Sequence, residues 1–497
     1  MKYDILTEPW LPVRELSGEV TNVGLLELLE EAHRFEAIDG LNPMEEYSVL
    51  RFLSVFLTAV FRPKRWRVKF ELLKEGSFDM SKIQAYIELC HKEGVSFDIF
   101  DEKRPFMQAM PNSEYDKQEH ITSSAKLNST RASGHNHIHY DHTLEKDASM
   151  SPAEAFVGIL TTQVFCPSDG SGYYPCINYK KGQGQPLYFL PKGKTLFETL
   201  ILAMFTISGD SNEREVWFND MEIIHKEDGV NAPSKLYGMM FPSRRIRLIV
   251  DGGLVKREYF QPGLHLASKS GWTDPHVAYY LDKNEIRQIT PSMDREGWRN
   301  IRTLAIQFAK NEADVPGVLR DYVEILSEQN QTMMEILAFG VVISSNAKYD
   351  DLQRGTFTLD TRIITNIKKS TMAGDMIAFM EEQGNILYNK LKIMLVNEKR
   401  LERTKKTRKK PNENKIIRIR HDYFSRCEKI FYEYSDRLAE QDADLSDLDS
   451  EFRNKVKRLL FFVLEEAENM YCSTADELIR AEKAMNRQFQ KNKRKGR

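Results

Sequence analysis

A glycine- and serine-rich segment at residues 167–174 (PSDGSGYY) has the composition of a loop that contacts a ligand. Its centre consists of two glycines around a serine, namely Gly170, Ser171 and Gly172. Because glycine has no Cβ, such a backbone can approach a ligand closely. Two lysines, Lys180 and Lys181, follow in a second glycine-containing stretch. Their positive charge predicts a polyanionic ligand, with phosphate as the first candidate, although this composition is also typical of an ordinary turn.

A second group of residues that could do chemistry lies between His135 and His142, where four histidines accompany Asp141. These residue types ligate transition metals, and the order His-Asn-His suggests a nuclease. In the nuclease motif of that name, however, the residues are spread over a ββα unit, whereas here they are adjacent in a polar stretch. A catalytic metal also needs fixed supporting residues around its ligands, which a loop rarely supplies. We expect no metal here, and a metal-dependent nuclease using His135–Asp141 is kept as an alternative function.

The sequence contains no motif that indicates catalysis. It has no Walker loop, serine-nucleophile elbow, HExxH helix or catalytic Cys/His pattern. The five cysteines are scattered, with no CxxC pair, which argues against both a disulfide framework and a cysteine zinc site. We therefore expect a protein without catalytic residues, metal or cofactor.

Size and charge limit the possible partners. A chain of 497 residues predicts two or three domains, and 41% hydrophobic and 29% charged residues are typical of a soluble globular protein. No apolar run could span a bilayer, and the acidic residue Asp4 stands where a secretory signal would be basic, so we expect a cytoplasmic protein without a membrane partner. The formal net charge of -2 excludes a global positive field, so any nucleic-acid contact must come from local patches.

The elements that would position these residues can be predicted from periodicity. A strand entering a turn is expected at 3–14, and helices are expected at 43–61, 152–165 and 196–207. The helix at 152–165 would lead directly into the glycine-rich segment. The polar stretch 113–146 predicts a long loop.

Two hairpins are expected in the middle of the chain. Residues 245–250 and 254–260 alternate around an Asp-Gly-Gly turn, with Lys256 just beyond it. A second hairpin or projecting turn is expected at 341–349, after a helix that ends near Gly340.

From Thr361 onward helical patterns dominate the sequence. Four amphipathic helices are predicted, at 363–396, 421–438, 452–470 and 474–489. Four such helices in succession imply a bundle. The sequence therefore predicts an α+β fold, in which a mixed α/β domain (1–360) carries the projecting loops and hairpins and a C-terminal four-helix bundle (361–497) follows. Basic runs at 399–410 and 491–497 are either solvated or in contact with phosphate.

Three segments resemble a known family. Leu6–Arg14 (LTEPWLPVR), Phe97–Gln108 (FDIFDEKRPFMQ) and Gln163–Gly172 are similar to the CasA family, the large subunit of the type I-E CRISPR Cascade surveillance complex. The order of a mixed α/β region before a helical bundle also matches, and the similarity covers essentially the whole chain.

This resemblance implies a non-catalytic subunit that recognises the protospacer-adjacent motif (PAM) of double-stranded target DNA, helps to start strand separation and recruits a separate helicase-nuclease. The implied partners also include guide RNA and other Cascade subunits, among them the small subunit. The family's glycine loop maps onto Gly170–Gly172, where a serine replaces one glycine, and its lysine finger maps onto Lys256. Its wedge maps onto Asn346, with Ser345 or Lys348 as alternatives.

Further features of the family bear on the polar stretch and on metal binding. Residues 123–142 resemble a region that becomes ordered against guide RNA and neighbouring subunits. Some relatives have a cysteine cluster that this chain lacks, so the resemblance implies no metal.

The implied roles agree with the physics of DNA recognition. The minor groove is narrow and distinguishes base pairs poorly, so a reader there favours close backbone approach and one long cation. A wedge beside the motif would cost a few kcal/mol of unstacking, and guide pairing would then read the sequence. A purely architectural subunit with passive loops is kept as a third possibility.

Overall fold

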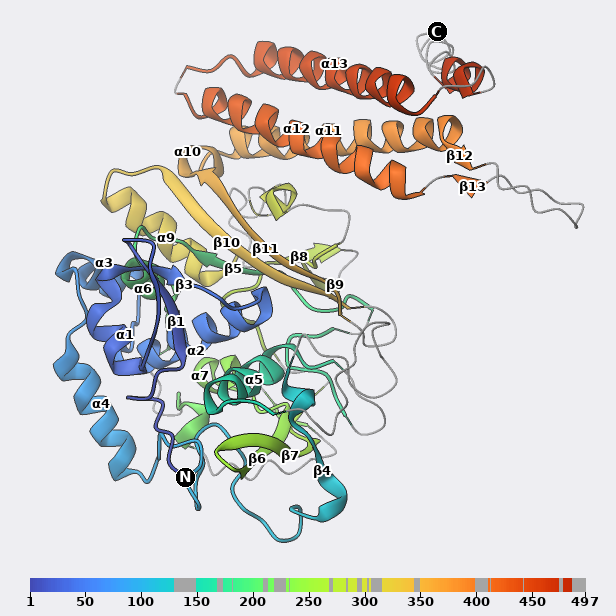
Figure 1. The fold of residues 1–497 in the computed structure, drawn as a ribbon. Helices are drawn as coiled ribbons and strands as arrows, with labels where there is room; N and C mark the ends of the chain where they lie inside the picture. The colour runs from blue at the N-terminus through green and yellow to red at the C-terminus, as the bar shows by residue number, and fades with distance from the viewer. Residues whose placement is uncertain are drawn as a thin grey trace, which may run out of the picture. The chain divides into compact units, whose positions relative to one another are not determined.

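A buried helix, α2 (Pro43–Phe61), lies at the centre of the first part of the fold in the computed structural model (Figure 1). Asn42 starts this helix, because its side chain accepts two backbone hydrogen bonds and Glu45 completes a capping box. Proline at the first helical position fits the same start. The helix ends at Phe61, and the next residue, Arg62, adopts the left-handed conformation with φ of 45°. Nearly all residues of α2 are buried, so other elements must surround it.

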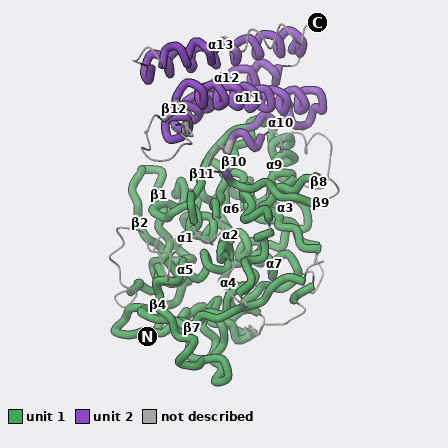
Figure 2. Tube along the Cα trace, turned by 90° about the vertical axis from the view of Figure 1, so that its right-hand side faces the viewer, with its two compact units in different colours: residues 1–291, 314–358 green, residues 292–313, 359–497 purple. Residues whose placement is uncertain are grey.

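The structure describes most of the chain, in two units. The described residues are 1–128, 149–167, 173–180, 182–208, 213–218, 229–231, 233–267, 271–282, 285–292, 297–301, 304, 315–343, 349–397, 410–411, 413–440, 442–472 and 477–484. Unit 1 comprises residues 1–291 and 314–358, and unit 2 comprises residues 292–313 and 359–497 (Figure 2). The division into two domains at residue 360 stays a prediction.

The helices of unit 1 pack around α2, and one of them leads to the glycine-rich segment. This helix, α5 (Pro152–Phe165), packs against α2 and begins with a capping box formed by Ser151 and Glu154. The ring of Trp10 joins the two helices, since it makes edge contacts with Phe52 of α2 and Phe156 of α5. The other helices that the structure describes in unit 1 are α1 (Leu25–Glu31), α3 (Trp66–Glu75), α4 (Met80–Lys92), α6 (Leu196–Ala203), α7 (Lys235–Met239) and α9 (Gly317–Glu328).

Among its described residues, unit 1 also contains four small antiparallel sheets. Their strands are β1 (Leu11–Glu15), β2 (Val20–Val23) and β3 (Phe35–Ile38) in the order β2-β1-β3; β5 (Tyr188–Pro191), β10 (Met333–Ile343) and β11 (Tyr349–Asp360) in the order β11-β10-β5; β4 (Ile121–Ser123), β6 (Arg244–Asp251) and β7 (Leu254–Pro262) in the order β4-β7-β6; and the pair β8 (Tyr279–Asp282) with β9 (Glu285–Gln288). The last residues of β11, Leu359 and Asp360, belong to unit 2.

The predicted β6–β7 hairpin is confirmed. Its strands pair from Arg244 with Pro262 to Asp251 with Leu254. The turn residues Gly252 and Gly253 have φ values of 62° and 83°, a backbone conformation that favours glycine. The polar stretch 113–146 contains β4 and short 3-10 turns as far as residue 128, and residues 129–148 lie outside the described ranges.

The predicted helix ending near Gly340 is wrong. Helix α9 ends at Glu328, and the chain then forms strand β10 through Gly340. The sequence MMEILAFGVVI is a nearly continuous apolar run, and periodicity alone does not distinguish a buried strand from a buried helix in such a run. Within this strand, glycine fits at position 340 because a Cβ there would lie 2.7 Å from Leu187 and 3.0 Å from Pro291.

Unit 2 contains the predicted C-terminal helices. They are α10 (Thr361–Ile364), α11 (Ile367–Met394), α12 (Glu413–Ala439) and α13 (Leu445–Tyr471), and residues 477–484 are also helical. Successive long helices run antiparallel, since Lys369 near the start of α11 donates to the carbonyl of Ala439 at the end of α12. Lys390 near the end of α11 donates to the carbonyl of Ala484 in the fourth helical segment. A short pair of strands, β12 (Val396–Asn397) and β13 (Lys410–Pro411), precedes α12.

Short 3-10 helices occupy several connections. They lie at Ala32–Arg34, Gln118–His120, Ser124–Leu127, Val216–Phe218 and Gly297–Asn300. Among the described residues, no helix is both long enough and apolar enough to cross a bilayer.

Candidate nucleic-acid interface

The two ends of the glycine-rich segment lie side by side. Helix α5 delivers the chain to Cys166 and Pro167, and the description resumes at Tyr173. The backbone N–H of Cys176 donates to the carbonyl of Cys166 over 2.9 Å, which joins the chain on either side of the segment. We call residues 166–167 and 173–176 the loop neck. The predicted site residues Gly170, Ser171 and Gly172 lie outside the described residues.

Arg244 contacts both sides of the loop neck. Its guanidinium donates to the carbonyl of Tyr174 and to the carbonyl of Pro167, each over 2.5 Å. The Arg244 side chain is 1% exposed and also lies 5.3 Å from the centre of the Tyr173 ring. No local sequence pattern points to this residue.

Aromatic side chains attach the loop neck to the β6–β7 hairpin. The ring of Tyr173 stacks on that of Phe260 in β7, and its hydroxyl donates to the Phe260 carbonyl over 3.2 Å. The ring of Tyr174 stacks on that of His265 with 3.9 Å between centroids. The loop neck therefore rests on the strand that also carries Lys256.

Lys256 lies near the tip of the hairpin, as predicted. Its side chain is 46% exposed, and its ammonium lies 2.9 Å from the carboxylate of Asp251 across the turn. This hydrogen bond is the largest effect that lowers the pKa of Asp251. At roughly 3.3 Å per residue, Lys256 is about 20 Å along the strand from Pro262, beside Arg244.

The β10–β11 pair contacts the chain just before the loop neck. The hydroxyl of Tyr349, the first residue of β11, donates to the carbonyl of Phe165 over 3.4 Å. Phe165 directly precedes the loop neck. The predicted wedge residues Ser345, Asn346 and Lys348 fall immediately before Tyr349 and lie outside the described residues.

Lys180 occupies a turn after the loop neck, in which its N–H donates to the carbonyl of Gly184. Its ammonium lies 4.9 Å from the centre of the Tyr279 ring, and partial burial lowers its pKa. This cation therefore already interacts with an aromatic face. Lys181 lies outside the described residues.

A buried polar network connects the segment after the loop neck to helix α2. Arg51 of α2 and Asp274 form an ion pair of 2.7 Å with side-chain exposures of 1% and 0%. The guanidinium also donates to the hydroxyl of Tyr47, which lies 3.1 Å from Nδ1 of His276. Asn178, close to Lys180, donates to the Asp274 carboxylate over 2.6 Å. The segment after the loop neck is thus tied to the central helix.

Burial controls the protonation of this network. Removal from water is the largest effect on His276, and it lowers the imidazole pKa to about 4 although Asp274 alone would raise it. Burial is the largest single effect on Asp274 and would raise its pKa, but the Arg51 charge together with His276 and the hydrogen bond from Asn178 lowers the pKa overall. The structure therefore holds a neutral His276 beside a charged pair at neutral pH.

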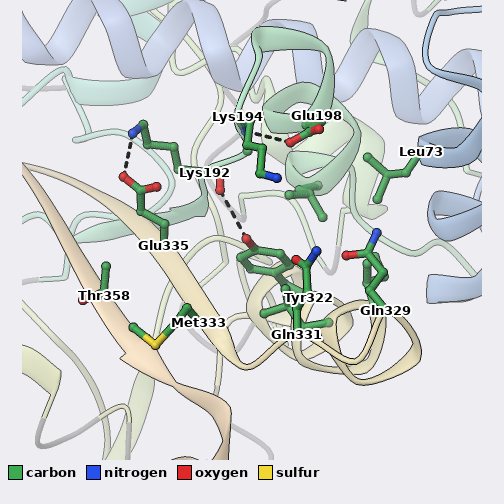
Figure 3. A pocket seen from close by; sticks show the side chains of 14 residues that line it. Leu73, Lys192, Lys194, Glu198, Tyr322, Gln329, Gln331, Met333, Glu335 and Thr358 are labelled. Carbon is green, nitrogen blue, oxygen red and sulfur yellow. Dashed lines mark hydrogen bonds and ion pairs between the residues drawn. The ribbon is translucent and has the colours of Figure 1, made fainter. Parts of the chain in front are cut away.

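A pocket of about 350 Å³ elsewhere in unit 1 contains none of the predicted site residues (Figure 3). Lys192 at its edge forms an ion pair of 2.6 Å with Glu335, and the Tyr322 hydroxyl donates to the Lys192 carbonyl. The backbone N–H of Lys194 donates to Glu198. The pocket is therefore not part of the surface around the loop neck.

In the ranges that the structure describes, no group of three or more His, Cys, Asp or Glu side chains is arranged to hold a metal ion. The histidine cluster His135–Asp141 lies outside these ranges. The nuclease alternative built on it stays a hypothesis.

The sequence of the chain matches the family described as CRISPR-associated protein Cse1 over residues 4–461. The chain belongs to the Cse1 family. A relative from Thermus thermophilus, CRISPR-associated protein CasA/Cse1, is 27% identical over 375 residues, which cover 73% of this Cse1-family chain and 72% of the relative. This agrees with the resemblance to the CasA family that the sequence motifs indicated.

Solved structures show the same fold. The structure of Thermus thermophilus CasA (Cse1) has a TM-score of 0.74 and 19% identity, covering 98% of this Cse1-family chain and 100% of that chain. A chain of a structure named CRISPR RNA-guided surveillance complex has a TM-score of 0.68 and 16% identity, covering 98% of this chain and 99% of that one. The predicted α+β fold with C-terminal helices is confirmed.

Proposed function

We propose that this Cse1-family chain is the large subunit of an RNA-guided CRISPR surveillance complex in the cytoplasm. In this role it recognises the PAM of double-stranded target DNA, helps to start strand separation and recruits a separate helicase-nuclease, while it breaks no bond itself. Family membership supports the proposal, and so does the similar chain in the RNA-guided surveillance complex. The partners would be target DNA, guide RNA and the other subunits, including the small subunit.

Contacts that attach two other elements to the loop neck and to the residue just before it support the proposal. Tyr173 attaches the neck to the hairpin of Lys256, and Tyr349 attaches the start of β11 to Phe165. The residues proposed to contact DNA (Gly170–Gly172, Lys256 and the tip at 345–348) would therefore belong to neighbouring parts of unit 1.

Each element has a distinct task in the proposed mechanism. Glycines let the backbone of Gly170–Gly172 approach the narrow minor groove, and Lys256 reaches acceptor atoms on base edges. Asn346 would insert beside the motif, and guide RNA would then pair with the opened strand. Lys180 and Lys181 would contribute positive charge near the phosphates.

Substitution of Lys256 in the assembled complex tests the proposal. We expect Lys256→Ala to weaken binding of a PAM-bearing duplex by roughly tenfold, as for loss of one base contact, and to change binding of a PAM-less duplex little. The melting temperature should stay unchanged, because an exposed ion pair contributes little to stability. Arg257→Ala, which removes the next exposed cation along β7, is the matched control. Equal affinities of wild type and Lys256→Ala for the PAM-bearing duplex would reject PAM reading by this residue.

The wedge has a separate test. We expect Asn346→Ala to reduce the permanganate reactivity of thymines beside the PAM more than it reduces duplex affinity, since strand opening follows binding. An unchanged footprint would reject a wedge at this position.

A further inference from the structure

Arg244 is a buried cation without a carboxylate partner among the described residues. Its side chain is 1% exposed, and its charge is met by the backbone carbonyls of Pro167, Tyr174 and Ser243. Removing a guanidinium from water costs several kcal/mol unless its surroundings compensate. The next residue, Arg245, is also buried, but its charge is compensated by an ion pair of 2.9 Å with Asp116. Arg244 therefore needs a different explanation.

The geometry of the Arg244 fork matches the two sides of the loop neck. One terminal nitrogen donates to the carbonyl before residues 168–172, at Pro167, and the other donates to the carbonyl after them, at Tyr174. A planar guanidinium can hold two acceptors at a fixed separation, whereas a lysine ammonium is a single flexible point charge. The fork thus sets the distance between the two ends of the segment.

The position of Arg244 is itself fixed by the helix that precedes the loop neck. The buried side chain of Gln163 in α5 accepts from the Arg244 N–H over 2.9 Å and donates to the Arg244 carbonyl over 2.8 Å. Two hydrogen bonds in opposite directions hold the backbone of β6 against α5. The guanidinium of Arg244 is therefore held in a fixed position relative to both α5 and the β6–β7 hairpin.

The charge of Arg244 acts on the loop neck as well. Burial alone would raise the pKa of the Cys166 thiol, but a hydrogen bond with Cys176 and the positive charge of Arg244 lower it to about 7. The positive charge of Arg244 therefore acts on a side chain of the loop neck.

We propose that Arg244 is a positioning residue for DNA recognition, which holds the two ends of residues 168–172 at the separation that PAM reading requires. Arg244 is too buried to contact DNA, so it acts through the loop neck. This inference rests on the proposed function, and it assigns to Arg244 a role in PAM discrimination in addition to any role in stability.

The test compares Arg244→Lys with Arg245→Lys, the same substitution at the neighbouring buried arginine. Each variant is assembled into the complex, and affinities for PAM-bearing and PAM-less duplexes are measured at one ionic strength. We expect Arg244→Lys to lower the ratio of the two affinities by roughly tenfold, while PAM-less binding stays unchanged. Arg245→Lys should lower thermal stability without changing the ratio. An unchanged ratio in assembled Arg244→Lys overturns the inference.

A second variant serves if Arg244→Lys does not fold. Gln163→Leu keeps the guanidinium but removes both hydrogen bonds to the Arg244 backbone, so we expect the same ratio to fall by a few-fold. An unchanged ratio in folded Gln163→Leu would then overturn the inference. Lys256→Ala, measured in the same experiment, distinguishes failure of the proposed function from failure of the proposed role of Arg244. If Lys256→Ala also leaves the ratio unchanged, the proposed function fails; if only Lys256→Ala lowers it, the role of Arg244 alone fails.

Discussion

The ammonium of Lys256 and the carboxylate of Asp251 lie 2.9 Å apart, across the two-glycine turn of the β6–β7 hairpin. The side chain of Lys256, the proposed lysine finger, is thus held by an ion pair within the same hairpin. Lys256 must leave Asp251 to reach a base edge, and the carboxylate also repels phosphate. Asp251 therefore opposes DNA binding in the proposed mechanism.

We predict that Asp251→Asn strengthens duplex binding by about two- to fivefold, because the exposed ion pair that holds Lys256 away from DNA is weak and its loss frees the ammonium. Fluorescence anisotropy with a PAM-bearing duplex measures the change, which should shrink at high salt. Glu285→Gln, at the first residue of β9, removes an exposed carboxylate that faces Arg287 and is the control. Weaker binding by Asp251→Asn would mean that Asp251 orients Lys256 for DNA.

Buried His276 predicts a loss of stability in acid. Its pKa is about 4 in the folded protein, below the ordinary value of 6.5, so the unfolded chain binds a proton first as the pH falls. The stabilisation is complete above pH 6.5 and decreases by up to about 3 kcal/mol as the pH falls to 4. Urea unfolding across this range should show a shallower decrease for His276→Gln than for wild type. His33→Gln should retain the wild-type slope, and equal slopes for all three proteins would contradict the prediction.

The Cys166–Cys176 pair predicts a thiolate at neutral pH. Thiolate absorbance at 240 nm should rise near pH 7, and Cys166→Ser should remove this transition. Arg244→Gln should move the transition to higher pH, because the stabilising positive charge is lost. Cys90→Ser is the control, since burial raises the pKa of Cys90 to about 12. A transition that survives in Cys166→Ser would assign the thiolate to another residue.

Close packing in unit 2 predicts a costly glycine substitution. A Cβ on Gly384 of α11 would lie 2.5 Å from the Phe424 ring of α12. Overpacking costs about 1–3 kcal/mol, which exceeds the gain of up to about 1 kcal/mol from helix propensity. Chemical denaturation should show a less stable Gly384→Ala. Gly355→Ala, where a Cβ meets nothing within 4 Å, should be neutral, and equal stability of the two variants would contradict the packing argument.

Local signals predicted several elements with accurate ends. Both α2 and α5 begin at a capping residue followed by proline, with glutamate at the third helical position, so their starts are encoded within a few residues. The β6–β7 hairpin follows from its Gly-Gly turn in the same way. The end of α6 was predicted at 207, but the helix ends at Ala203. The prediction was too long because the apolar sequence continues beyond the last helical residue.

Elements decided by burial were harder to predict. Strand β10 is apolar at nearly every position because it is buried, so its sequence has no alternation to identify it. Only its partners β5 and β11 reveal it as a strand.

The candidate site was predictable only in part. Lys256 could be found because a turn and a family resemblance fix its place, and the structure puts it near the hairpin tip. Arg244 contacts Pro167 and Tyr174 across 77 and 70 residues, and Tyr349 contacts Phe165 across 184 residues. Long-range pairings of this kind leave no local pattern in a single sequence. The roles of Gly170–Gly172 and Asn346 stay predictions.

The Arg51–Asp274 pair constrains how the family can diverge. Removing one member leaves the other as an isolated buried charge, which costs about 3–5 kcal/mol, whereas replacing both by apolar residues is often neutral. Evolution therefore has no easy single step at either position. We expect the two positions to covary among homologues, so that a lineage without the arginine has also lost the aspartate.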